Sequence, residues 1–421
     1  MDLLADLDAR GLIHDTTDRA ALAARLAGGP VTLYHGIDPT ADSLHVGHLI
    51  GLLMLRRFAE AGHRTVALAG GATGMVGDPS GRSNERNLLD EARLRANVVA
   101  ITEQIRRVVG DGHQWELVDN LDWTASLSLL DFLRDVGKHA TVNQMIARES
   151  VKARMEGAQG ISYTEFSYML LQANDFRWLH EHKGVELQIG GSDQWGNILS
   201  GVELIRRTSG ALVHALCWPL LLGPDGQKLG KSTGGRIWLA AERTSPYQFF
   251  QHWMGTDDRQ VAELLAMFTL LPISEVTEIA EAHAAEPERR LGQRRLAAEV
   301  TALVHGPAAA ATAASAAGVL FGGGLDDVDA ATFEAIAGEV PTIHIDRTRL
   351  EEGIAVVDLL VETGACGSKS EAWRLLDQGG VRVDGQKAGA DEVLSGGGRL
   401  RLGRWLLLRR GKSDYRLVDV S

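Results

Sequence analysis

The stretch YHGIDPTADSLHVGHL, residues 34–49, contains a strand end, a turn and a helix start in close succession. A β-type run over Val31–Gly36 precedes the turn-rich segment DPTADS, and a helix-period pattern follows over 46–61. Asp42 or Ser43 is expected to cap that helix. Its first amides would then lie at the carboxyl end of the strand, where free N–H groups and the positive end of the helix dipole can bind phosphate.

Two histidines lie at the start of this expected helix. His45 and His48 are three residues apart and therefore share one face of the first turn, and Gly47 leaves no side chain between that face and a ligand. Such a pair could bind a metal ion, but no third ligand lies near it in the sequence. It could also be structural, which is the commoner outcome for HxxH alone, so the motif needs a second signal.

The residues after this stretch alternate between apolar strands and helices. Buried strands are expected at 65–69, 115–118 and 186–189, with a Gly-rich loop over 70–82 and a helix over 90–109. Short apolar strands separated by helices are typical of a parallel sheet with helices on both faces. The fold class expected for the first part of the chain is therefore α/β, with a Rossmann-like parallel sheet.

The pattern changes twice after this α/β part. The pattern over about 245–317 predicts helices, and a Gly-Gly-Gly run is followed by an acidic, weakly periodic segment. The last segment has its own helices, turn and strands. We therefore expect an α/β domain, an α-helical domain, a linker and a small α+β domain, with boundaries at 1–232, 233–320, 321–350 and 351–421.

The bulk composition is that of an ordinary soluble protein, with 45% apolar and 23% charged residues among its 421. No apolar stretch reaches the ~18–20 residues of a membrane span. The first residues are acidic and amphipathic, whereas a secretory signal starts with basic residues and an apolar run. The two cysteines, Cys217 and Cys366, do not have a metal-ligand spacing. A cytoplasmic location without a membrane partner is expected.

The net charge of −12 argues at first against a nucleic-acid partner, but the charge is unevenly distributed. Residues 351–421 contain 11 basic and 11 acidic residues, so the acidic excess lies before them. Six arginines and a lysine lie between Arg399 and Arg416. A phosphate-binding surface can therefore occur in this last segment of an acidic protein.

A second candidate motif is KLGKS, residues 228–232, within GPDGQKLGKSTGG. Lys228 and Lys231 lie on a loop with glycines on both sides, which could close over a polyphosphate and open again. A solvated basic turn is the commoner outcome for such a stretch alone. HVGH and KLGKS at opposite ends of one α/β region form a more specific pair than either motif.

HVGH and KLGKS resemble the two signatures of class I aminoacyl-tRNA synthetases, whose usual forms are HIGH and KMSKS. Leu-Gly in place of Met-Ser departs from the general pattern. A glycine at this position resembles the form of the motif found in the tyrosine-specific branch. The strings YHGIDPTADSLHVGHL, GDPSGR, SYTEFSYMLLQANDF and LQIGGSDQWGNI also resemble that branch in its bacterial form. The resemblance covers nearly the whole chain and implies an enzyme that activates L-tyrosine with ATP and transfers it to tRNA(Tyr).

The resemblance implies an activation step that needs no protein nucleophile. The tyrosine carboxylate is already ionised and pyrophosphate is a good leaving group, so the enzyme must align the reactants and neutralise charge on the phosphates. The residues implied to do this are Thr40, His45, His48, Arg82, Arg86, Lys228, Lys231 and Ser232. Arg82 stands where the family often has lysine, which keeps the charge and changes the geometry. Mg²⁺ is expected to arrive with ATP, and no tightly bound protein metal is expected.

Substrate choice is implied to depend on two groups that hydrogen-bond the phenolic hydroxyl, Tyr34 and Asp175. The other residues implied to bind tyrosine are Asp78, Tyr168, Gln172, Gln188 and Gln194, and those implied to bind ATP are Gly36, Asp38, His45, Gly47, His48, Gly191, Asp193 and Lys231. Tyr168, Gln172 and Asp175 are spaced four and three apart, so one helical face presents all three. The spacing supports these assignments, although a solvated amphipathic helix has the same pattern.

The last segment resembles the S-four-like RNA-binding domain, which is named after a ribosomal protein. Lys369 and Arg374 lie on its expected helix pair, and a basic surface of this kind suits phosphates and RNA shape. Where the family commonly has further arginines, this chain has Ser368, Glu371 and Trp373, so a modest RNA affinity is expected of this segment alone. The family also implies a homodimer formed through the catalytic domains, and no DNA partner.

Two other interpretations are open at this point. A tryptophan-specific relative shares the fold, but the phenol-binding pair and the RNA-binding segment argue against it. An RNA-binding regulator descended from a synthetase would have lost signature residues, whereas His45, His48, Lys228 and Lys231 are all present.

Overall fold

The computed structural model describes residues 2–78, 80, 90–155, 160–221, 231–232 and 235–421. The chain forms two compact units, Met1–Thr244 with Trp253–Leu296 and Ser245–His252 with Ala297–Ser421. The first unit contains a mainly parallel sheet, and the second contains a smaller mixed sheet. Within the described ranges, no helix is long and apolar enough to cross a membrane.

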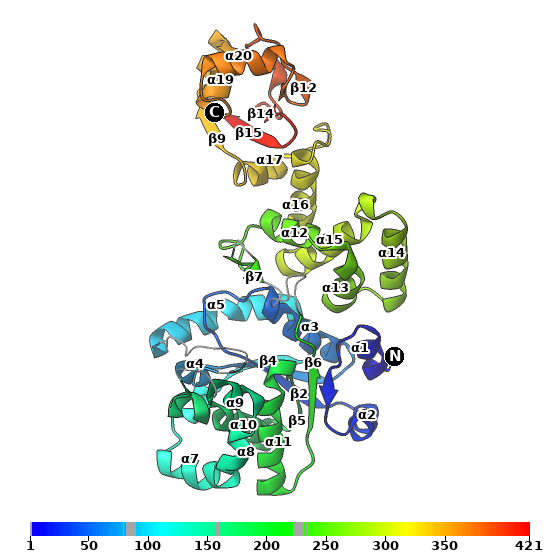
Figure 1. Ribbon diagram of the computed structural model, residues 1–421, viewed down its shortest axis with the longest axis vertical. Coiled ribbons are helices and arrows are strands. Elements are labelled where there is room, and N and C mark those ends of the chain that lie inside the picture. Colours follow the sequence, from blue (N-terminus) through cyan, green and yellow to red (C-terminus); the bar gives the residue numbers. More distant parts are fainter. Residues whose placement is uncertain (1, 79, 81–89, 156–159, 222–230, 233–234) are drawn as a thin grey trace. The chain divides into compact units, whose positions relative to one another are not determined.

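A six-stranded sheet forms the centre of the first unit (Figure 1). Its strand order is β1-β6-β5-β2-β3-β4, in which β1 runs antiparallel to β6 and the other neighbours are parallel. The strands are β1 (Asp15–Thr16), β2 (Thr32–Ile37), β3 (Arg64–Ala69), β4 (Trp115–Asp119), β5 (Val185–Gly191) and β6 (His214–Trp218). The predicted α/β class is confirmed, and the sequence predicts β2 to β5 but neither β1 nor β6.

Helices cover both faces of this sheet (Figure 1). α3 (Val46–Glu60) packs on one face with α5 (Glu91–Val109) against it, and α10 (Tyr163–Lys183) and α11 (Trp195–Ser209) pack on the other. α3 is buried on almost all sides because it lies between the sheet, α5 and α13 (Val261–Phe268). The other helices before β6 are α1 (Leu3–Ala9), α2 (Arg19–Ala27), α4 (Thr73–Val76), α6 (Leu121–Thr124), α7 (Leu129–Asp135), α8 (Val142–Ile146) and α9 (Glu149–Met155).

The strand order reverses beside β2. The chain runs from β2 outward to β3 and β4, and then returns to the opposite side of β2 as β5. In open α/β sheets, ligands bind outside the carboxyl ends of the strands at such a reversal. Polar residues that follow β2, β4 and β5 meet at this edge, among them Asp38, Asn120 and Asp193.

A segment that is distant in the sequence lies beside the start of α3. The short antiparallel pair β7 (Lys231–Ser232) and β8 (Gly235–Arg236) leads into it. The Val46 amide donates to the Ile237 carbonyl (3.0 Å), and the Leu239 amide donates to the Leu44 carbonyl (2.8 Å). The residues just after KLGKS therefore lie next to HVGH.

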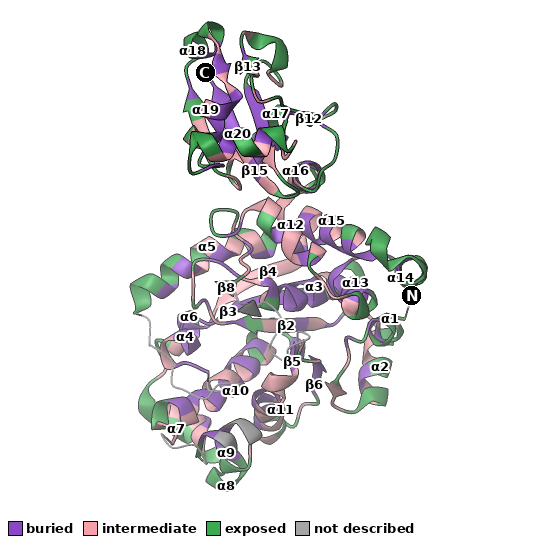
Figure 2. Ribbon diagram, turned by 45° about the horizontal axis from the view of Figure 1, so that its top comes forward, coloured by how far each residue is buried: buried purple, intermediate pink, exposed green. Residues whose placement is uncertain are grey.

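The second unit contains a five-stranded sheet of order β12-β11-β14-β15-β9, in which only the β15–β9 pair is parallel. Helices α19 (Val356–Glu362) and α20 (Lys369–Asp377) share an apolar core with this sheet, and this core is purple in Figure 2. The strands are β9 (Thr342–Ile345), β11 (Val381–Val383), β12 (Gln386–Lys387), β14 (Trp405–Arg410) and β15 (Asp414–Val420), and β10 (Ile354–Ala355) pairs with β13 (Val393–Leu394). Further helices along the chain are α12 (Pro246–Met254), α14 (Ile273–Ala285), α15 (Leu291–His305), α16 (Pro307–Leu320), α17 (Ala330–Ala337) and α18 (Arg347–Glu352).

The linker predicted over 321–350 is wrong, because α17 and β9 lie within it. β9 pairs along its whole length with β15, and Phe333 on α17 is fully buried in one cluster with Trp405. The apolar pattern of β9 is weak because it is an edge strand on which Ile345 is the one fully buried residue. An edge strand of four residues has too few buried positions to produce a clear alternation.

Candidate active site

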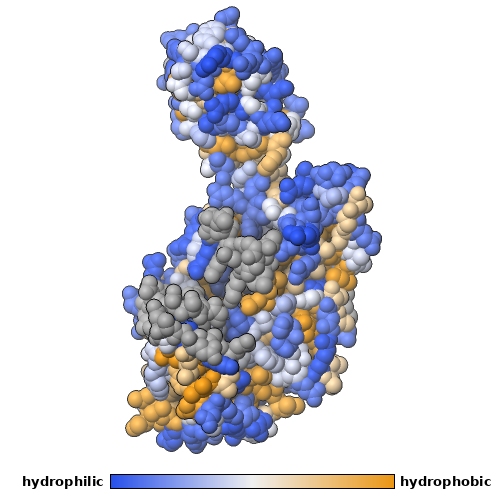
Figure 3. Space-filling model, viewed as in Figure 1, coloured by the Kyte–Doolittle hydropathy of each residue, from blue (hydrophilic) through white to orange (hydrophobic). Residues whose placement is uncertain are grey.

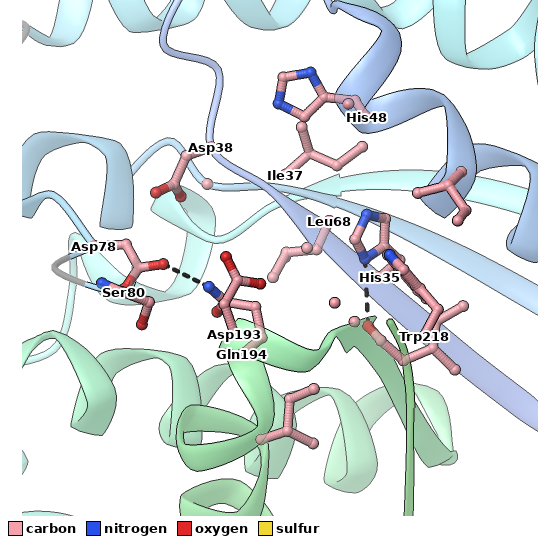
Figure 4. A pocket seen from close by; sticks show the side chains of 18 of the residues that line it. His35, Ile37, Asp38, His48, Leu68, Asp78, Ser80, Asp193, Gln194 and Trp218 are labelled. Atoms are coloured by element: carbon pink, nitrogen blue, oxygen red, sulfur yellow. Dashed lines mark hydrogen bonds between the residues drawn. The ribbon is translucent and has the colours of Figure 1, made fainter. Parts of the chain in front are cut away.

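A cavity of about 610 Å³ lies at the carboxyl edge of the six-stranded sheet. Its lining comes from β2, β5 and the segments that follow the strands, together with the first turn of α3 and one face of α10. Figure 4 shows some of these residues, among them His35 of β2, His48 of α3 and Asp193 after β5. Every predicted site residue whose side chain is described lines it: Tyr34, Gly36, Asp38, Thr40, His45, Gly47, His48, Asp78, Tyr168, Gln172, Asp175, Gln188, Gly191, Asp193 and Gln194. The structure thus brings these residues to one place, while their roles stay predictions.

Five other predicted residues are not placed in this way. Arg82, Arg86 and Lys228 lie outside the described residues. Lys231 and Ser232 form β7, but their side chains are also outside the description.

The first histidine of HVGH caps α3. Its Nδ1 accepts a hydrogen bond from the Gly47 amide (3.1 Å), and the Nδ1 of His48 accepts one from the His45 amide (3.2 Å). The two rings lie 4.0 Å apart. The expectation that Asp42 or Ser43 caps the helix is therefore wrong, because the Ser43 hydroxyl is engaged elsewhere, accepting from the Ala240 amide (3.0 Å).

A tryptophan from the segment after KLGKS contacts this helix start. The Trp238 ring lies 6.1 Å from the His45 ring in an edge-on arrangement. The guanidinium of Arg243 lies 4.4 Å from the centre of the same indole, and that of Arg236 lies 5.7 Å from it. Because Arg236 also lines the cavity, it adds a positive charge at the end where α3 begins.

The cavity is also lined by a buried carboxyl group. Asp175 is 1% exposed, and its two carboxylate oxygens accept from Trp123 Nε1 and Asn120 Nδ2, each at 2.9 Å. Burial raises the pKa of Asp175 to about 7, and the negative charges of Asp38 and Asp119 add to this rise, whereas the two hydrogen bonds oppose it. A carboxyl group that lines a cavity and titrates near neutral pH is a functional-site candidate.

Tyr34 lies beside this carboxyl group on the same face of the sheet as Gln188, its register partner on β5. Its ring packs against Phe176 at 5.4 Å, and it is fully buried. Burial and the charge of Asp175 raise the pKa of its hydroxyl well above the usual value, so the hydroxyl stays protonated. Among the described residues, the Tyr34 hydroxyl and the side-chain oxygens of Gln172 and Gln188 have no hydrogen-bond partner. Buried polar atoms of this kind are costly unless a ligand or water meets them.

A chain of hydrogen bonds joins the buried carboxyl group to the middle of the cavity. Asn120 Nδ2 also donates to Thr73 Oγ1 (3.1 Å), which donates to Asp38 Oδ1 (2.8 Å). The Tyr168 hydroxyl donates to Asp38 Oδ2 (3.1 Å). The carboxyl groups of Asp175 and Asp38 are therefore linked through the hydrogen bond from Asn120 to Thr73.

A third acidic group, Asp78, also lines the cavity. Asp78 accepts from the Gln194 side chain (2.7 Å) and from the Ser80 amide (2.9 Å), and it points toward the middle of the cavity in Figure 4. Asp78 and Asp38 therefore place two carboxylates against the same space, which suits an ammonium group.

His35, the residue after Tyr34 on β2, also lines the cavity (Figure 4). Its Nδ1 lies 3.3 Å from the Ile189 carbonyl oxygen, and its ring meets Trp218 edge-on at 5.2 Å. Burial lowers the pKa of His35 to about 4, so the ring is neutral at physiological pH. A Cβ at position 51 would lie 2.3 Å from His35 Nε2, and Gly51 on α3 therefore makes room for this ring.

Sequence reasoning missed several residues of this site, namely His35, Thr73, Asn120, Trp123 and Arg236. Asn120 follows β4 directly, so a polar side chain after a predicted strand was an available signal. Trp123 and Arg236 carried no such signal, because only the tertiary fold brings Trp123 to Asp175 and Arg236 to the cavity.

Comparison with known protein families agrees with this geometry. Residues 26–322 match the family described as tRNA synthetases class I (W and Y). Residues 332–418 match the family described as the tyrosine–tRNA ligase SYY-like C-terminal domain. The sheet, the cavity and the two signatures are thus those of a class I tRNA synthetase.

Individual relatives narrow the assignment. A tyrosine–tRNA ligase of Opitutus terrae is 49% identical over 424 residues and covers 100% of both chains, and one of Roseiflexus castenholzii is 48% identical over 428 residues and covers 99% of both. A crystal structure of a C-terminally truncated mitochondrial tyrosyl-tRNA synthetase of Aspergillus nidulans is 33% identical, with a TM-score of 0.69, and covers 76% of this chain and 94% of that one. The chain belongs to the tyrosine–tRNA ligase family.

Proposed function

We propose that this chain activates L-tyrosine with ATP and transfers it to tRNA(Tyr). The ionised tyrosine carboxylate attacks the α-phosphorus of ATP, the bond to the β-phosphate oxygen breaks, and pyrophosphate leaves. A terminal hydroxyl of the tRNA adenosine then attacks the tyrosyl carbonyl, and AMP leaves. The observation that carries the proposal is that the buried pair Tyr34 and Asp175 lines the same cavity as the start of α3.

The tyrosine would lie with its hydroxyl between these two side chains. Asp175 accepts the phenolic proton, and the Tyr34 hydroxyl, which has no described protein partner, donates to the phenolic oxygen. The α-ammonium group would lie between Asp78, Tyr168 and Gln172, and Asp38 would fix Tyr168 through the 3.1 Å hydrogen bond. Both polar ends of the amino acid are then matched.

The ATP phosphates would lie at the start of α3. His45, His48 and Thr40 line that end, where the first amides of the helix and the cation of Arg236 favour negative charge. Gly47 and Gly191 allow the nucleotide to approach the backbone, and Asp193 could accept from the ribose hydroxyls. Mg²⁺ would arrive bound to the phosphates and neutralise part of their charge. A cytoplasmic location, where ATP and tRNA are present, is part of the proposal.

The preference for tyrosine over phenylalanine should increase with pH. Asp175, with a pKa of about 7, is mostly protonated at about pH 6 and mostly ionised at about pH 8, and the ionised form is the better acceptor for the phenol. The measurement is the ratio of kcat/KM for tyrosine to that for phenylalanine, because groups that act on both substrates cancel. A ratio that stays flat or falls over this range would contradict the role of Asp175.

The second unit would supply tRNA binding. Its arginines are partly offset by acidic partners, since Arg404 pairs with Asp419 and both Arg410 and Arg416 pair with Asp414. A truncated protein that ends before Gly322 lacks both β9 and β15, so neither strand is left without its partner. This protein should still form the adenylate, but its rate of tRNA charging should fall at least about tenfold. Exchange of pyrophosphate into ATP and tRNA charging, measured on the same preparation, separate the two steps. If the truncated protein is folded and charges tRNA at the rate of the full-length protein, the second unit does not supply tRNA binding.

A homodimer is also part of the proposal. α7 to α9 carry exposed apolar side chains, namely Leu129, Leu130, Leu133, Val142, Ile146 and Met155. An apolar cluster of this kind is typical of an interaction surface, and apolar side chains gather over this end of the unit at the lower left of Figure 3. Leu130→Glu should convert a dimer to monomers in sedimentation experiments, whereas Leu212→Glu, at a leucine of similar exposure elsewhere, should not. If the wild-type protein itself sediments as a monomer, the proposed homodimer is wrong.

Aminoacylation of bulk bacterial tRNA, tested with each labelled amino acid, tests the proposed function. Labelled tyrosine alone should become attached to tRNA. Attachment of tryptophan would favour the tryptophan-specific relative, and absence of any attachment would favour a non-catalytic RNA-binding protein.

A further inference from the structure

Three aromatic rings form a continuous stack behind the buried carboxyl group of the cavity. The Trp123 and Trp178 rings lie 4.2 Å apart and 9° from parallel, and the Trp178 and His182 rings lie 4.3 Å apart and 11° from parallel. Trp123 is buried, Trp178 is partly buried and His182 is exposed, so the stack runs from the core to the surface. None of the predicted site residues contacts Trp178 or His182 through a ring or hydrogen bond described above.

The stack joins α10, which carries the carboxyl group of Asp175, to α6, whose Trp123 donates a hydrogen bond to it. Asp175, Trp178 and His182 lie on α10 at spacings of three and four residues, so they share one face of that helix. Trp123 lies on α6, and it contacts that face twice, by its N–H to Asp175 (2.9 Å) and by its ring to Trp178. The indole is thereby fixed in plane and in rotation.

α6 needs such external support. It is a four-residue helix without a side-chain N-cap, and so short a helix has little stability of its own. Yet α6 and the residue before it provide both donors to Asp175, since Asn120 directly precedes Leu121. Displacement of α6 would therefore weaken both hydrogen bonds to the carboxylate together.

The outer end of the stack is itself fixed. The Nδ1–H of His182 donates to the Trp178 carbonyl oxygen (2.9 Å), one helical turn away, which holds the imidazole parallel to the indole. The stack therefore has a defined geometry up to the surface of the protein.

We propose that Trp178 is a positioning residue for substrate specificity, which acts through Trp123 to hold Asp175 where it meets the hydroxyl of tyrosine. His182 extends the same support. The inference rests on the proposed function, because it gives Trp178 a role in how the enzyme distinguishes tyrosine from phenylalanine. Trp178 touches neither substrate, so its effect is confined to the group that reads the hydroxyl.

The test is pyrophosphate exchange into ATP by the full-length protein, with kcat and KM measured separately for tyrosine and phenylalanine. Trp178→Ala should raise the KM for tyrosine about 3- to 10-fold, which is the usual range for the loss of an aromatic pair. The KM for phenylalanine should change less than about twofold, since phenylalanine has no hydroxyl for Asp175 to bind. Trp178→Phe should recover at least half of the lost selectivity, and His182→Ala should have a smaller effect than Trp178→Ala.

Controls separate positioning from general damage. Trp115→Leu removes a partly buried indole from the opposite end of β4 and should leave the selectivity unchanged. The stacked indoles should also give an exciton couplet in circular dichroism that Trp178→Ala abolishes. If Trp178→Ala does not fold, Trp178→Phe and His182→Ala carry the same comparison.

Three results would overturn the inference. Equal losses for tyrosine and phenylalanine in the Trp178 variants would show a merely structural role. Unchanged selectivity, or a wild-type protein without the exciton couplet, would show that the stack does not position Asp175. A wild-type protein that activates phenylalanine or another amino acid but not tyrosine would instead contradict the proposed function, and the two failures are therefore distinguishable.

Discussion

Asp175→Ala is expected to lower kcat/KM for tyrosine activation by about 10²–10³-fold. The variant loses a hydrogen bond between the substrate and a charged group, and it leaves two buried donors without an acceptor. The donors are Trp123 Nε1 and Asn120 Nδ2, which both bind this carboxylate in the structure. Tyr34→Phe should lower the same quantity less, since its hydroxyl is neutral and its removal strands no described protein partner. Both variants should reduce the preference for tyrosine over phenylalanine.

The reason for the reduced preference is general. A site that hydrogen-bonds a hydroxyl leaves its own buried polar groups unpaired when an analogue without that hydroxyl enters. Tyrosine-activating enzymes are the usual example of this effect, so the principle is not independent evidence for this chain. What the structure adds is the location of the effect at Asp175 and its two donors.

A matched control lies close by. Asp122 is an exposed carboxylate on α6, the same short helix as Trp123, and does not line the cavity. Asp122→Ala should leave the tyrosine-to-phenylalanine ratio unchanged. If both Asp175→Ala and Tyr34→Phe also left it unchanged, the hydroxyl would be recognised elsewhere.

His45→Ala should lower the single-turnover rate of adenylate formation by about 10²–10³-fold, the usual cost of one lost transition-state contact, while tyrosine binding stays nearly intact. It should also destabilise the protein by about 1 kcal/mol, because the imidazole caps α3 through the Gly47 amide. Two effects of one side chain are thus expected, and thermal unfolding and stopped-flow kinetics measure them separately.

His45→Asn distinguishes the two effects. Asparagine is a favourable N-cap residue, so this variant should regain most of the stability and little of the rate. A His45→Ala variant that lost its affinity for tyrosine but kept its single-turnover rate would show that the assigned role is wrong. Recovery of the rate by asparagine would show that capping, and not transition-state contact, is what His45 contributes.

The sequence predicted those parts of the fold whose signals are local. β2 and α3 follow from an apolar run, a turn and a helical period within residues 31–61, and the structure has them within about one residue of the predicted bounds. The α10 face that carries Tyr168, Gln172 and Asp175 follows from spacing alone, and all three line the cavity.

The features that the sequence did not predict depend on competing hydrogen bonds or on contacts between distant residues. Asp42 and Ser43 are good capping residues by type, but His45 caps α3 because Ser43 accepts a hydrogen bond from residue 240, far away in the sequence. The sequence predicts a linker where β9 lies because the partner of β9, β15, is far along the chain at Asp414–Val420. Trp123 reaches Asp175 across 52 positions, and no local pattern encodes such a contact.

The most direct test of the proposed function is exchange of labelled pyrophosphate into ATP by the wild-type protein, with each of the common amino acids supplied in turn. The hydroxyl-reading site at Tyr34 and Asp175 predicts exchange with tyrosine and exchange with phenylalanine that is lower by orders of magnitude. Exchange with tryptophan or phenylalanine that equals or exceeds exchange with tyrosine would contradict it.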